Sequence, residues 1–205
     1  MAVKDRSLDP LIIKAAKEEF LEYGYEKASL HKIVKKAGIT TGALYTRYKN
    51  KDGLFCSLVE PAMAEMKEKL MPMMEEYQAV GQSKDLDQFI RVIKKEEQIC
   101  LDLLFDFYDE CVLFFCNSGG SSIGESIENL KKMKAKETVE FFKAIGGDGG
   151  KIDLDGIEFI ISQQFDYYKG ILEKGYTQEK AIECMKTIEI FVDAGWKAVF
   201  AEIKK

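Results

Sequence analysis

The sequence predicts an all-α protein of roughly nine helices, in which a small three-helix head precedes a larger helical domain. Apolar residues recur at intervals of three and four along most of the chain, which is the spacing of one helix face. The interruptions are rich in glycine and in capping residues, as at 117–122, 146–150 and 175–177. Between these turns no segment alternates polar and apolar residues in the manner of a strand.

The composition is that of a globular protein rather than a disordered or membrane-spanning one. Of 205 residues, 46% are hydrophobic and 32% are charged, and only 3 are proline. No apolar run approaches the ~18 residues that a membrane-spanning helix needs. The first ten residues lack the apolar core of a signal peptide, so we expect a cytoplasmic protein.

Charge is distributed unevenly along the chain. Residues 1–53 contain 11 Lys or Arg against 7 Asp or Glu, a balance of +4. The remaining residues contain 19 against 28, a balance of −9, and the net charge of −5 hides this asymmetry. A basic head on an acidic body is typical of a phosphate-binding module joined to a domain that does not bind nucleic acid.

The first helix is expected to begin at Asp9, with Pro10 in a first turn where its missing N–H costs nothing. Gly24 is expected to end it. Lys14 and Lys17 lie on one side, either as phosphate contacts or as solvated surface. The buried stripe consists of Ile12, Ala15, Ala16, Phe20 and Leu21.

Two short helices follow around a tight turn. Ser29 caps the first, and Gly38 stops it because glycine accepts the left-handed conformation without a Cβ penalty. Thr40 caps the second, which covers residues 42–48 and turns Leu44 inward. This arrangement predicts a helix-turn-helix, in which the N-terminal residues of the second helix meet base edges in the major groove.

The residues AGITTGALYTRYKNKDGLF, from Ala37 to Phe55, resemble the DNA-binding segment of the TetR family of bacterial transcriptional regulators. The similarity rests on the Ala-Gly pair, a small cap, a helical glycine, the Leu-Tyr pair, and an aromatic residue followed by Lys-Asn-Lys. It covers roughly residues 9 to 59. The resemblance implies a homodimeric repressor that a small-molecule effector releases from a palindromic DNA operator.

The resemblance places the DNA contacts at Thr40, Thr41, Gly42, Ala43, Tyr45, Thr46, Arg47, Lys49 and Lys51. Thr41 and Ala43 align with positions that read base edges, and Gly42 permits close approach. Arg47 is the long donor one turn further on, placed either to bind guanine with two hydrogen bonds or to clamp a phosphate. The family pattern assigns phosphate contacts to Tyr45, Lys49 and Lys51. Thr46 fits either role, and Tyr48 packs inside the head.

Asn50 is expected to cap a fourth helix, which Pro61 should kink. We place the domain boundary near Glu60. Residues 1–59 then form the helix-turn-helix domain, and residues 60–205 form a helical domain for effector binding and dimerisation. The further expected helices are Asp85–Lys95, Glu97–Cys116, Ser122–Ile145, Leu154–Lys174 and Gln178–Ile203.

The last two expected helices are apolar on more than one side. Side chains such as Phe159, Phe191 and Trp196 are spread over too much of the circumference for one core stripe. Such helices need two partners, their own core and another subunit. In TetR-like proteins these helices form a four-helix bundle across a two-fold axis, so the resemblance implies a homodimer through about residues 154–203.

The expected helix Glu97–Cys116 carries one apolar stripe with acidic residues opposite, which fits a core face and a solvated face. Alternatively, Phe107, Tyr108 and Cys111 line a ligand cavity. Met66 is soft enough to line an adaptable pocket, although core filling explains it equally well. The resemblance implies an effector cavity in this domain without assigning its residues.

No enzyme motif, metal site or cofactor is expected. His31 is the single histidine, and its helical phase places it on the surface. Cysteines 56, 100, 111, 116 and 184 stand at no metal-ligand spacing and are expected to be reduced thiols. The chain has no nucleophile motif or phosphate loop. The rival hypothesis is an all-helical ligand-binding protein or enzyme in which the head is a scaffold, and sequence-specific binding to duplex DNA would separate the two.

Overall fold

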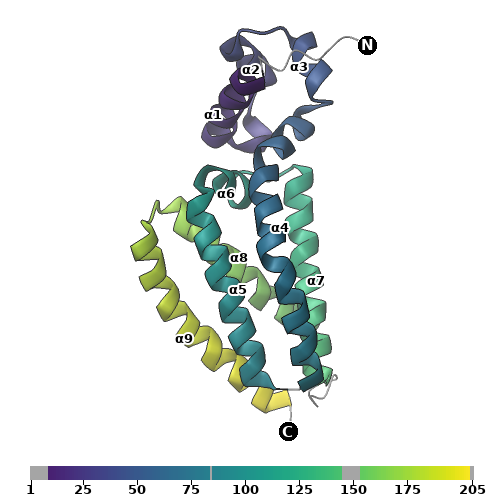
Figure 1. The fold of residues 1–205 in the computed structure, drawn as a ribbon, viewed down its shortest axis with the longest axis vertical. Helices are drawn as coiled ribbons and strands as arrows, with labels where there is room; N and C mark the ends of the chain where they lie inside the picture. The colour runs from purple at the N-terminus through teal and green to yellow at the C-terminus, as the bar shows by residue number, and fades with distance from the viewer. Residues whose placement is uncertain (1–8, 84, 145–152, 204–205) are drawn as a thin grey trace. The chain divides into compact units, whose positions relative to one another are not determined.

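The computed structural model describes residues 9–83, 85–144 and 153–203 (Figure 1). Within these ranges it contains nine helices and no strand, which confirms the predicted fold class. The predicted glycine break at 146–150 lies outside the described residues. The helices are α1 (Asp9–Lys27), α2 (Leu30–Ala37), α3 (Thr41–Arg47), α4 (Lys51–Ser83), α5 (Leu86–Asp106), α6 (Tyr108–Phe115), α7 (Ser122–Ala144), α8 (Leu154–Glu173) and α9 (Gln178–Ile203).

The chain folds into two compact units. The first consists of the chain up to Met63 together with Asp109–Ser126, and the second consists of Ala64–Tyr108 and the chain from Ile127 onward. Asp109–Ser126 therefore belongs to the first unit, although it falls in the predicted second domain. The position of the domain boundary near Glu60 remains a prediction.

Aromatic rings form the centre of the first unit. Phe20 of α1 and Phe55 of α4 are fully buried, with ring centroids 5.0 Å apart and planes at 73°. The ring of Tyr25 lies 5.2 Å from that of Phe55. The branched aliphatic side chains of the first unit with at most 1% exposure are Ile12, Ile33, Leu44, Leu54, Val59 and Leu113. Burying each such side chain stabilises the fold by about 1.5–3 kcal/mol, so these residues hold the helices of the first unit together.

The end of α1 differs from the prediction. Gly24 leaves the helical conformation (φ 70°, ψ 171°), but α1 resumes and extends to Lys27. Asn117, in the turn after α6, forms hydrogen bonds with main-chain groups of α1 at this point. Its Nδ2 donates to the carbonyl oxygens of Phe20 at 3.0 Å and Leu21 at 3.1 Å. Its own carbonyl oxygen accepts the N–H of Tyr25 at 2.8 Å.

The start of α4 is also tied to the segment that follows α6. Asn50 caps α4 as predicted, accepting the N–H of Gly53 at 2.8 Å. The carboxylate of Asp52 accepts from the main-chain N–H of Ser122 at 2.9 Å and from its hydroxyl at 2.7 Å. These bonds, with those of Asn117, explain why Asp109–Ser126 joins the first unit.

The predicted gap between Lys95 and Glu97 is wrong, because α5 runs through it without a break. No glycine, proline or helix-capping residue interrupts the sequence there. The break lies instead at Phe107 (φ −127°, ψ 49°), whose N–H bonds to the carbonyl oxygen of Leu103 at 3.0 Å. The apolar stripe predicted for one helix is therefore divided between α5 and α6.

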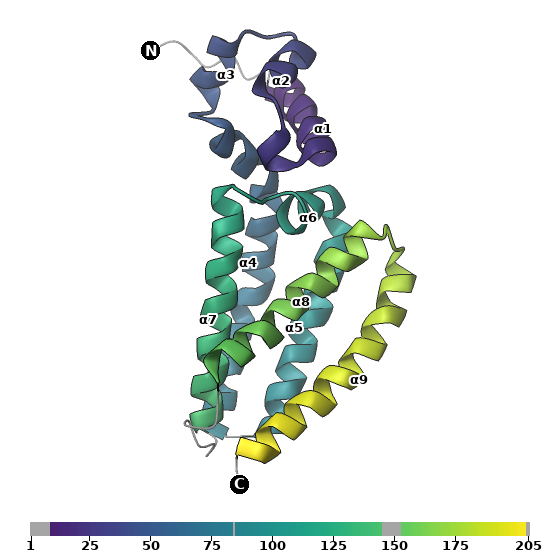
Figure 2. The same ribbon diagram turned by 180° about the vertical axis from the view of Figure 1, so that it is seen from behind.

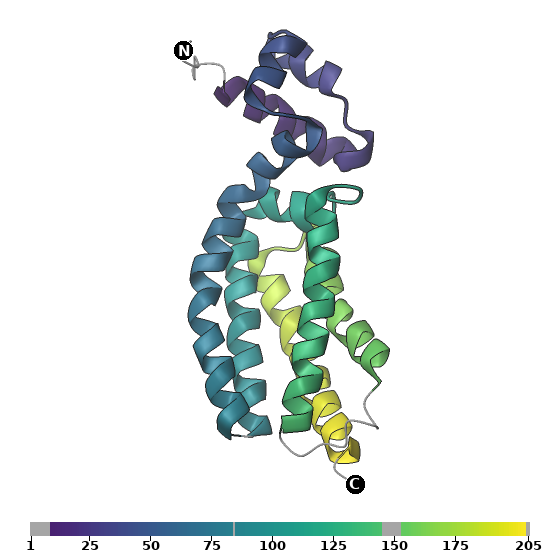
Figure 3. The ribbon, with the colours of Figure 1, turned by 90° about the vertical axis from the view of Figure 1, so that its right-hand side faces the viewer.

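Two apolar clusters hold the second unit together. In one, Met73 and Val80 pack with Phe89 and Val92, so α4 and α5 lie side by side (Figure 3). α4 reaches this cluster because it stays helical through both Pro61 and Pro72.

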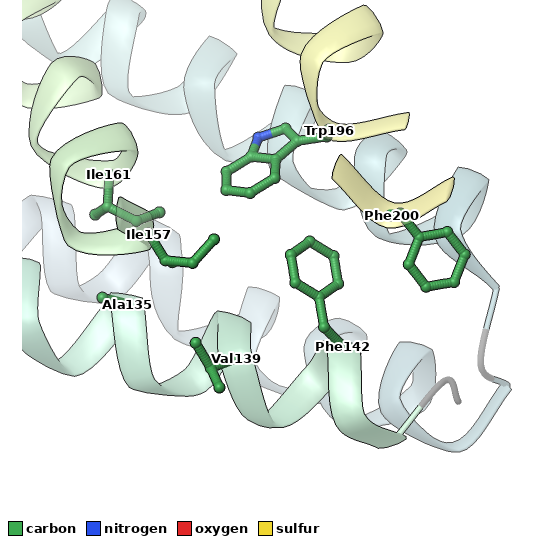
Figure 4. Packing of buried hydrophobic residues seen from close by; sticks show 7 residues of the cluster. All are labelled: Ala135, Val139, Phe142, Ile157, Ile161, Trp196 and Phe200. Carbon is green, nitrogen blue, oxygen red and sulfur yellow. The ribbon is translucent and has the colours of Figure 1, made fainter. Parts of the chain in front are cut away.

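In the other cluster, α7, α8 and α9 meet around Phe142, which is fully buried (Figure 4). Its ring centroid lies 5.6 Å from that of Trp196 and 5.9 Å from that of Phe200. α8 and α9 form an antiparallel pair, and both extend downward from the short turn that joins them (Figure 2). The cluster fixes one side of each of these two helices.

Glu97 of α5 is an acidic residue in the interior of the second unit, only 8% exposed. Gln164 donates to its carboxylate at 3.3 Å, and within the described residues no cation forms an ion pair with it. Burial raises the pKa of Glu97 to about 7, and the nearby carboxylates of Glu189, Glu96 and Asp193 add to the shift.

This raised pKa predicts that the second unit loses stability as the pH rises. The folded state holds the Glu97 proton more tightly than the unfolded chain, so the free energy of unfolding falls between the ordinary pKa of 4.5 and about 7. Glu97→Gln cannot ionise, and it should raise the free energy of unfolding by about 1–3 kcal/mol at pH 8. At pH 4.5 it should have little effect.

Urea unfolding of both proteins at the two pH values checks this expectation. Glu137→Gln, at an exposed position of α7, is the matched control and should not change the pH dependence. Identical unfolding curves for wild type and Glu97→Gln at pH 8 would contradict the assignment.

Candidate DNA-binding surface

α2, a tight turn and α3 form the predicted helix-turn-helix. Ser29 caps α2, and its hydroxyl accepts a main-chain N–H of the first turn at 3.4 Å. Gly38 adopts the left-handed conformation (φ 67°, ψ 30°). The N–H of Ile39 then returns to the carbonyl oxygen of Val34 at 3.0 Å, which closes the end of α2. The predicted cap and the predicted glycine stop are both confirmed.

α3 buries one side chain and displays most of the others. Thr40 caps it, its hydroxyl oxygen accepting the N–H of Ala43 at 3.1 Å. Leu44 is 1% exposed and anchors the helix to the core, whereas Tyr45 is 49% exposed. Ala43 is half-buried. The other predicted contacts on this helix that are exposed are Thr41, Gly42 and Thr46.

Arg47 differs from the prediction, because its guanidinium is bound within the first unit. Its Nε donates to the carboxylate of Asp9 at 2.8 Å, and its Nη1 donates to the carbonyl oxygen of Ala43 at 3.1 Å. The side chain is only 11% exposed. In this conformation it neither extends toward a guanine nor reaches out to a phosphate. Periodicity gives no sign of the pairing, since Asp9 and Arg47 are 38 residues apart.

The two lysines after α3 differ in their surroundings. Lys49 is exposed, as a phosphate contact requires. Lys51 donates to the carbonyl oxygen of Glu26 at 3.0 Å, and its ammonium lies 4.9 Å from the ring centroid of Tyr25. Burial lowers the pKa of Lys51. Lys51 therefore joins the start of α4 to the end of α1, and Lys49 is the better placed of the two for a phosphate.

Some of the other lysines of the first unit form ion pairs. Lys17, predicted as a phosphate contact or free surface, instead pairs with Glu110 at 2.8 Å and Asp109 at 3.3 Å. Lys36 pairs with Glu18. The residues of α1 and α2 that remain exposed include Lys14, Lys35 and His31, the last as predicted.

The four predicted ligand-binding residues are divided between the two units. Met66, Phe107 and Tyr108 belong to the second unit and are half-buried, and the Tyr108 hydroxyl donates to the carbonyl oxygen of Leu172 at 3.2 Å. Cys111 belongs to the first unit and is 2% exposed, and burial raises its pKa to about 12. Their role as cavity residues remains a prediction.

A hollow of about 220 Å³ lies between α8 and α9 in the second unit. Its lining includes Tyr167, Phe191 and Trp196, and none of the four predicted ligand-binding residues. The two aromatic residues of α9 in this lining differ sharply in exposure, because Phe191 is 75% exposed and Trp196 is 3% exposed. The indole Nε1 of Trp196 has no hydrogen-bond partner among the described residues.

The part of the chain that matches a known family lies in the first unit. Residues 12–58, which cover α1 to α3 and the first turns of α4, match the family described as "Bacterial regulatory proteins, tetR family". The similarity in sequence to the TetR family thus covers the helix-turn-helix segment of the chain.

Curated sequence relatives each match about a third of the chain. A Bacillus subtilis protein described as "Uncharacterized HTH-type transcriptional regulator YhgD" is 35% identical over 65 residues, which are 32% of this chain and 34% of the relative. The "Fatty acid metabolism regulator protein" of Bacillus subtilis is 37% identical over 59 residues, 29% of this chain and 30% of the relative. The chain thus matches about a third of the length of these curated relatives.

Solved TetR-like structures are similar over nearly the whole chain. A TetR-like transcriptional regulator from Rhodococcus sp. RHA1 has a TM-score of 0.58 at 15% identity and covers 95% of this chain and 100% of its own. A putative fatty acid metabolism regulator from Clostridium perfringens has a TM-score of 0.55 at 19% identity and covers 90% of this chain and 97% of its own. At these identities the likeness shows a shared fold.

None of the described helices is long and apolar enough to span a membrane. No group of three or more His, Cys, Asp or Glu side chains in the described ranges is placed to hold a metal ion.

Proposed function

We propose that this TetR-family protein is a homodimeric transcriptional repressor, acting in the cytoplasm, that binds a palindromic operator and is released from it by a small-molecule effector. The observation that carries the proposal is the display of Thr41, Gly42 and Tyr45 on α3 while Leu44 anchors that helix. In a helix-turn-helix, the side chains at the start of the second helix meet the base edges.

Phosphate binding completes the proposed interface. Residues 1–53 carry a balance of +4, and Tyr45 and Lys49 are exposed on either side of the end of α3. Thr46 lies between them, and its exposed hydroxyl oxygen is open to a phosphate-bound water or to a base. Cations near phosphates release counterions on binding, so affinity falls steeply with salt.

The operator should be palindromic, and its binding should depend on salt. Lys49→Ala should weaken this binding. A symmetric dimer uses Lys49 twice, so the slope of log affinity against log salt should fall by about 2. The loss should be the same for the operator and for unrelated duplex, because a phosphate contact carries no sequence information. The measurement is fluorescence anisotropy of duplexes chosen from a random pool, at several salt concentrations.

The control is Lys132→Ala, an exposed lysine of α7 in the second unit, which should leave the slope unchanged. Failure of the full-length protein to enrich any duplex from the pool would refute the regulator and favour the rival scaffold hypothesis. Loss of only specific binding in Lys49→Ala would show that Lys49 reads a base.

Dimerisation through α8 and α9 is supported by the side chains that these helices expose. Phe159, Ile190 and Phe191 are 73%, 73% and 75% exposed, which is unusual for large apolar residues. A two-fold axis would place this face against its own copy, so both copies would cover it. The opposite sides of α8 and α9 already pack on α7 in the Phe142 cluster.

Phe191→Lys should convert the dimer to a monomer without unfolding it. The side chain is exposed in one subunit, so the charge costs little there, but in the dimer it would be desolvated at a cost of several kcal/mol. Sedimentation equilibrium checks this. Met133→Lys on α7, which replaces an apolar residue with 49% exposure, is the matched control and should stay dimeric. A dimeric Phe191→Lys of unchanged affinity would exclude this face as the interface.

The second unit is proposed to hold the effector, with Met66, Phe107 and Tyr108 among its contacts. Two relatives are named as regulators of fatty acid metabolism, so long-chain fatty acids and their thioesters are the first compounds to test. An effector that prefers the DNA-free state by about 1–3 kcal/mol would loosen the operator some 5- to 150-fold. By reciprocity, the operator would weaken effector binding by the same factor.

Paired titration of operator with and without effector tests this coupling. Phe107→Trp should reduce the response to the effector while leaving operator binding of the free protein near normal, because the substitution fills space only in the second unit. A compound that binds tightly yet leaves operator affinity unchanged would contradict release by that compound.

A further inference from the structure

We infer that Arg47 is a positioning residue for α3, and that the base contacts of α3 are made by its hydroxyl and methyl groups, for which thymine is the matching base. The inference rests on the proposed DNA binding and identifies which base the short helix selects. It concerns α3 alone.

The Arg47 guanidinium already has hydrogen-bond partners within the first unit. Nε is committed to Asp9 at 2.8 Å, and Nη1 is committed to the carbonyl oxygen of Ala43 at 3.1 Å. A guanidinium binds guanine through two parallel N–H groups of its planar fork. To present that fork, Arg47 would have to leave both partners and emerge from a site where it is 11% exposed. The bond to Asp9 instead ties the end of α3 to the first residue of α1, and the bond to Ala43 lies within α3.

The other side chains at the start of α3 lack the groups that bind a purine with two hydrogen bonds. From Thr40 to Thr46 the sequence is TTGALYT, which contains no Asn, Gln, Lys, Arg, Asp or Glu. Asn and Gln are the side chains that bind adenine with two hydrogen bonds, and Arg and Lys do the same for guanine. Without Arg47, α3 has no group for either of these contacts.

The hydroxyl groups of Thr40 and Thr46 already form hydrogen bonds with the main chain. The Thr46 hydroxyl donates its proton to the carbonyl oxygen of Gly42 at 2.8 Å, and the Thr40 oxygen already accepts from Ala43. Each of these threonines still carries a methyl group, as does exposed Thr41. The C5-methyl of thymine is the one apolar group on the major-groove edges, and small methyl-bearing side chains pack against it.

The first experiment uses the wild-type protein, so it does not depend on any variant folding. The operator is selected from a random duplex pool, and deoxyuridine then replaces each thymidine of both half-sites, which removes the methyl and keeps the base pairing. At one symmetric pair of positions affinity should fall about 15-fold, or about 4-fold for each methyl. Deoxyuridine outside the half-sites is the control and should have no effect.

A matched pair of substitutions connects this effect to α3. Thr41→Ser removes the methyl and keeps the hydroxyl, so it should reduce the preference for thymidine over deoxyuridine. Thr41→Val keeps the methyl and replaces the hydroxyl by a second methyl, so it should retain that preference. If neither change alters the preference, the same pair at Thr46 completes the test, and no change at either site overturns the inference.

The role of Arg47 is tested by a double-mutant cycle with Asp9. Arg47→Ala and Asp9→Asn should each weaken operator binding, and the double variant should be no weaker than the worse single one, because the two residues act as a pair. Pool selection with Arg47→Ala should return the same consensus as wild type. Affinities are compared at a temperature where the melting curves show every variant to be folded.

If Arg47→Ala relaxes one base position while Asp9→Asn does not, Arg47 reads that base and the inference is overturned. An operator that is enriched but insensitive to deoxyuridine overturns thymine recognition while leaving the proposed regulator standing. If no duplex is enriched, both proposals fail together.

Discussion

The left-handed turn at Gly38 is the constraint on which the display of α3 depends. A helix of seven residues is not stable by itself in water, so its shape must come from its surroundings. Gly38 reverses the chain, Thr40 supplies the cap, and Leu44 fixes the inner face. The bond from Arg47 to Asp9 ties the far end. With both ends and one face held, the remaining side chains keep a constant spacing, which a rigid duplex requires of any protein that reads it.

The features predictable from the sequence are those that depend on near neighbours. Caps and glycine stops involve residues within about five positions, so Ser29, Gly38 and Asn50 are visible as patterns. The pairing of Arg47 with Asp9 is not, because it depends on how α1 and α3 cross. The break at Phe107 also lacks a glycine or proline to announce it. Side chains that meet across the fold are therefore where the sequence-based expectations were corrected.

In α8 and α9, too, the side that the core covers depends on contacts between distant parts of the chain. Periodicity shows that both helices are apolar on more than one side, but it does not show which side the chain's own core covers. Phe191 and Trp196 are five positions apart and similar in size, yet one is 75% exposed and the other 3%. The packing of Phe142 of α7 against Trp196 and Phe200 assigns Trp196 to the core and leaves Phe191 exposed.

The first unit is built from two separate segments of the chain, which affects how it is synthesised and how it can be inherited. Asn117 and Ser122 complete α1 and α4, although Ala64–Tyr108 lies between the two segments in the chain. A ribosome must therefore deliver the turn after α6 before the head has all its hydrogen bonds. Recombination that exchanged residues 1–59 alone between relatives would part the carbonyl oxygens of α1 from the amide that binds them. The piece that can be inherited intact is a pair of segments rather than an N-terminal block.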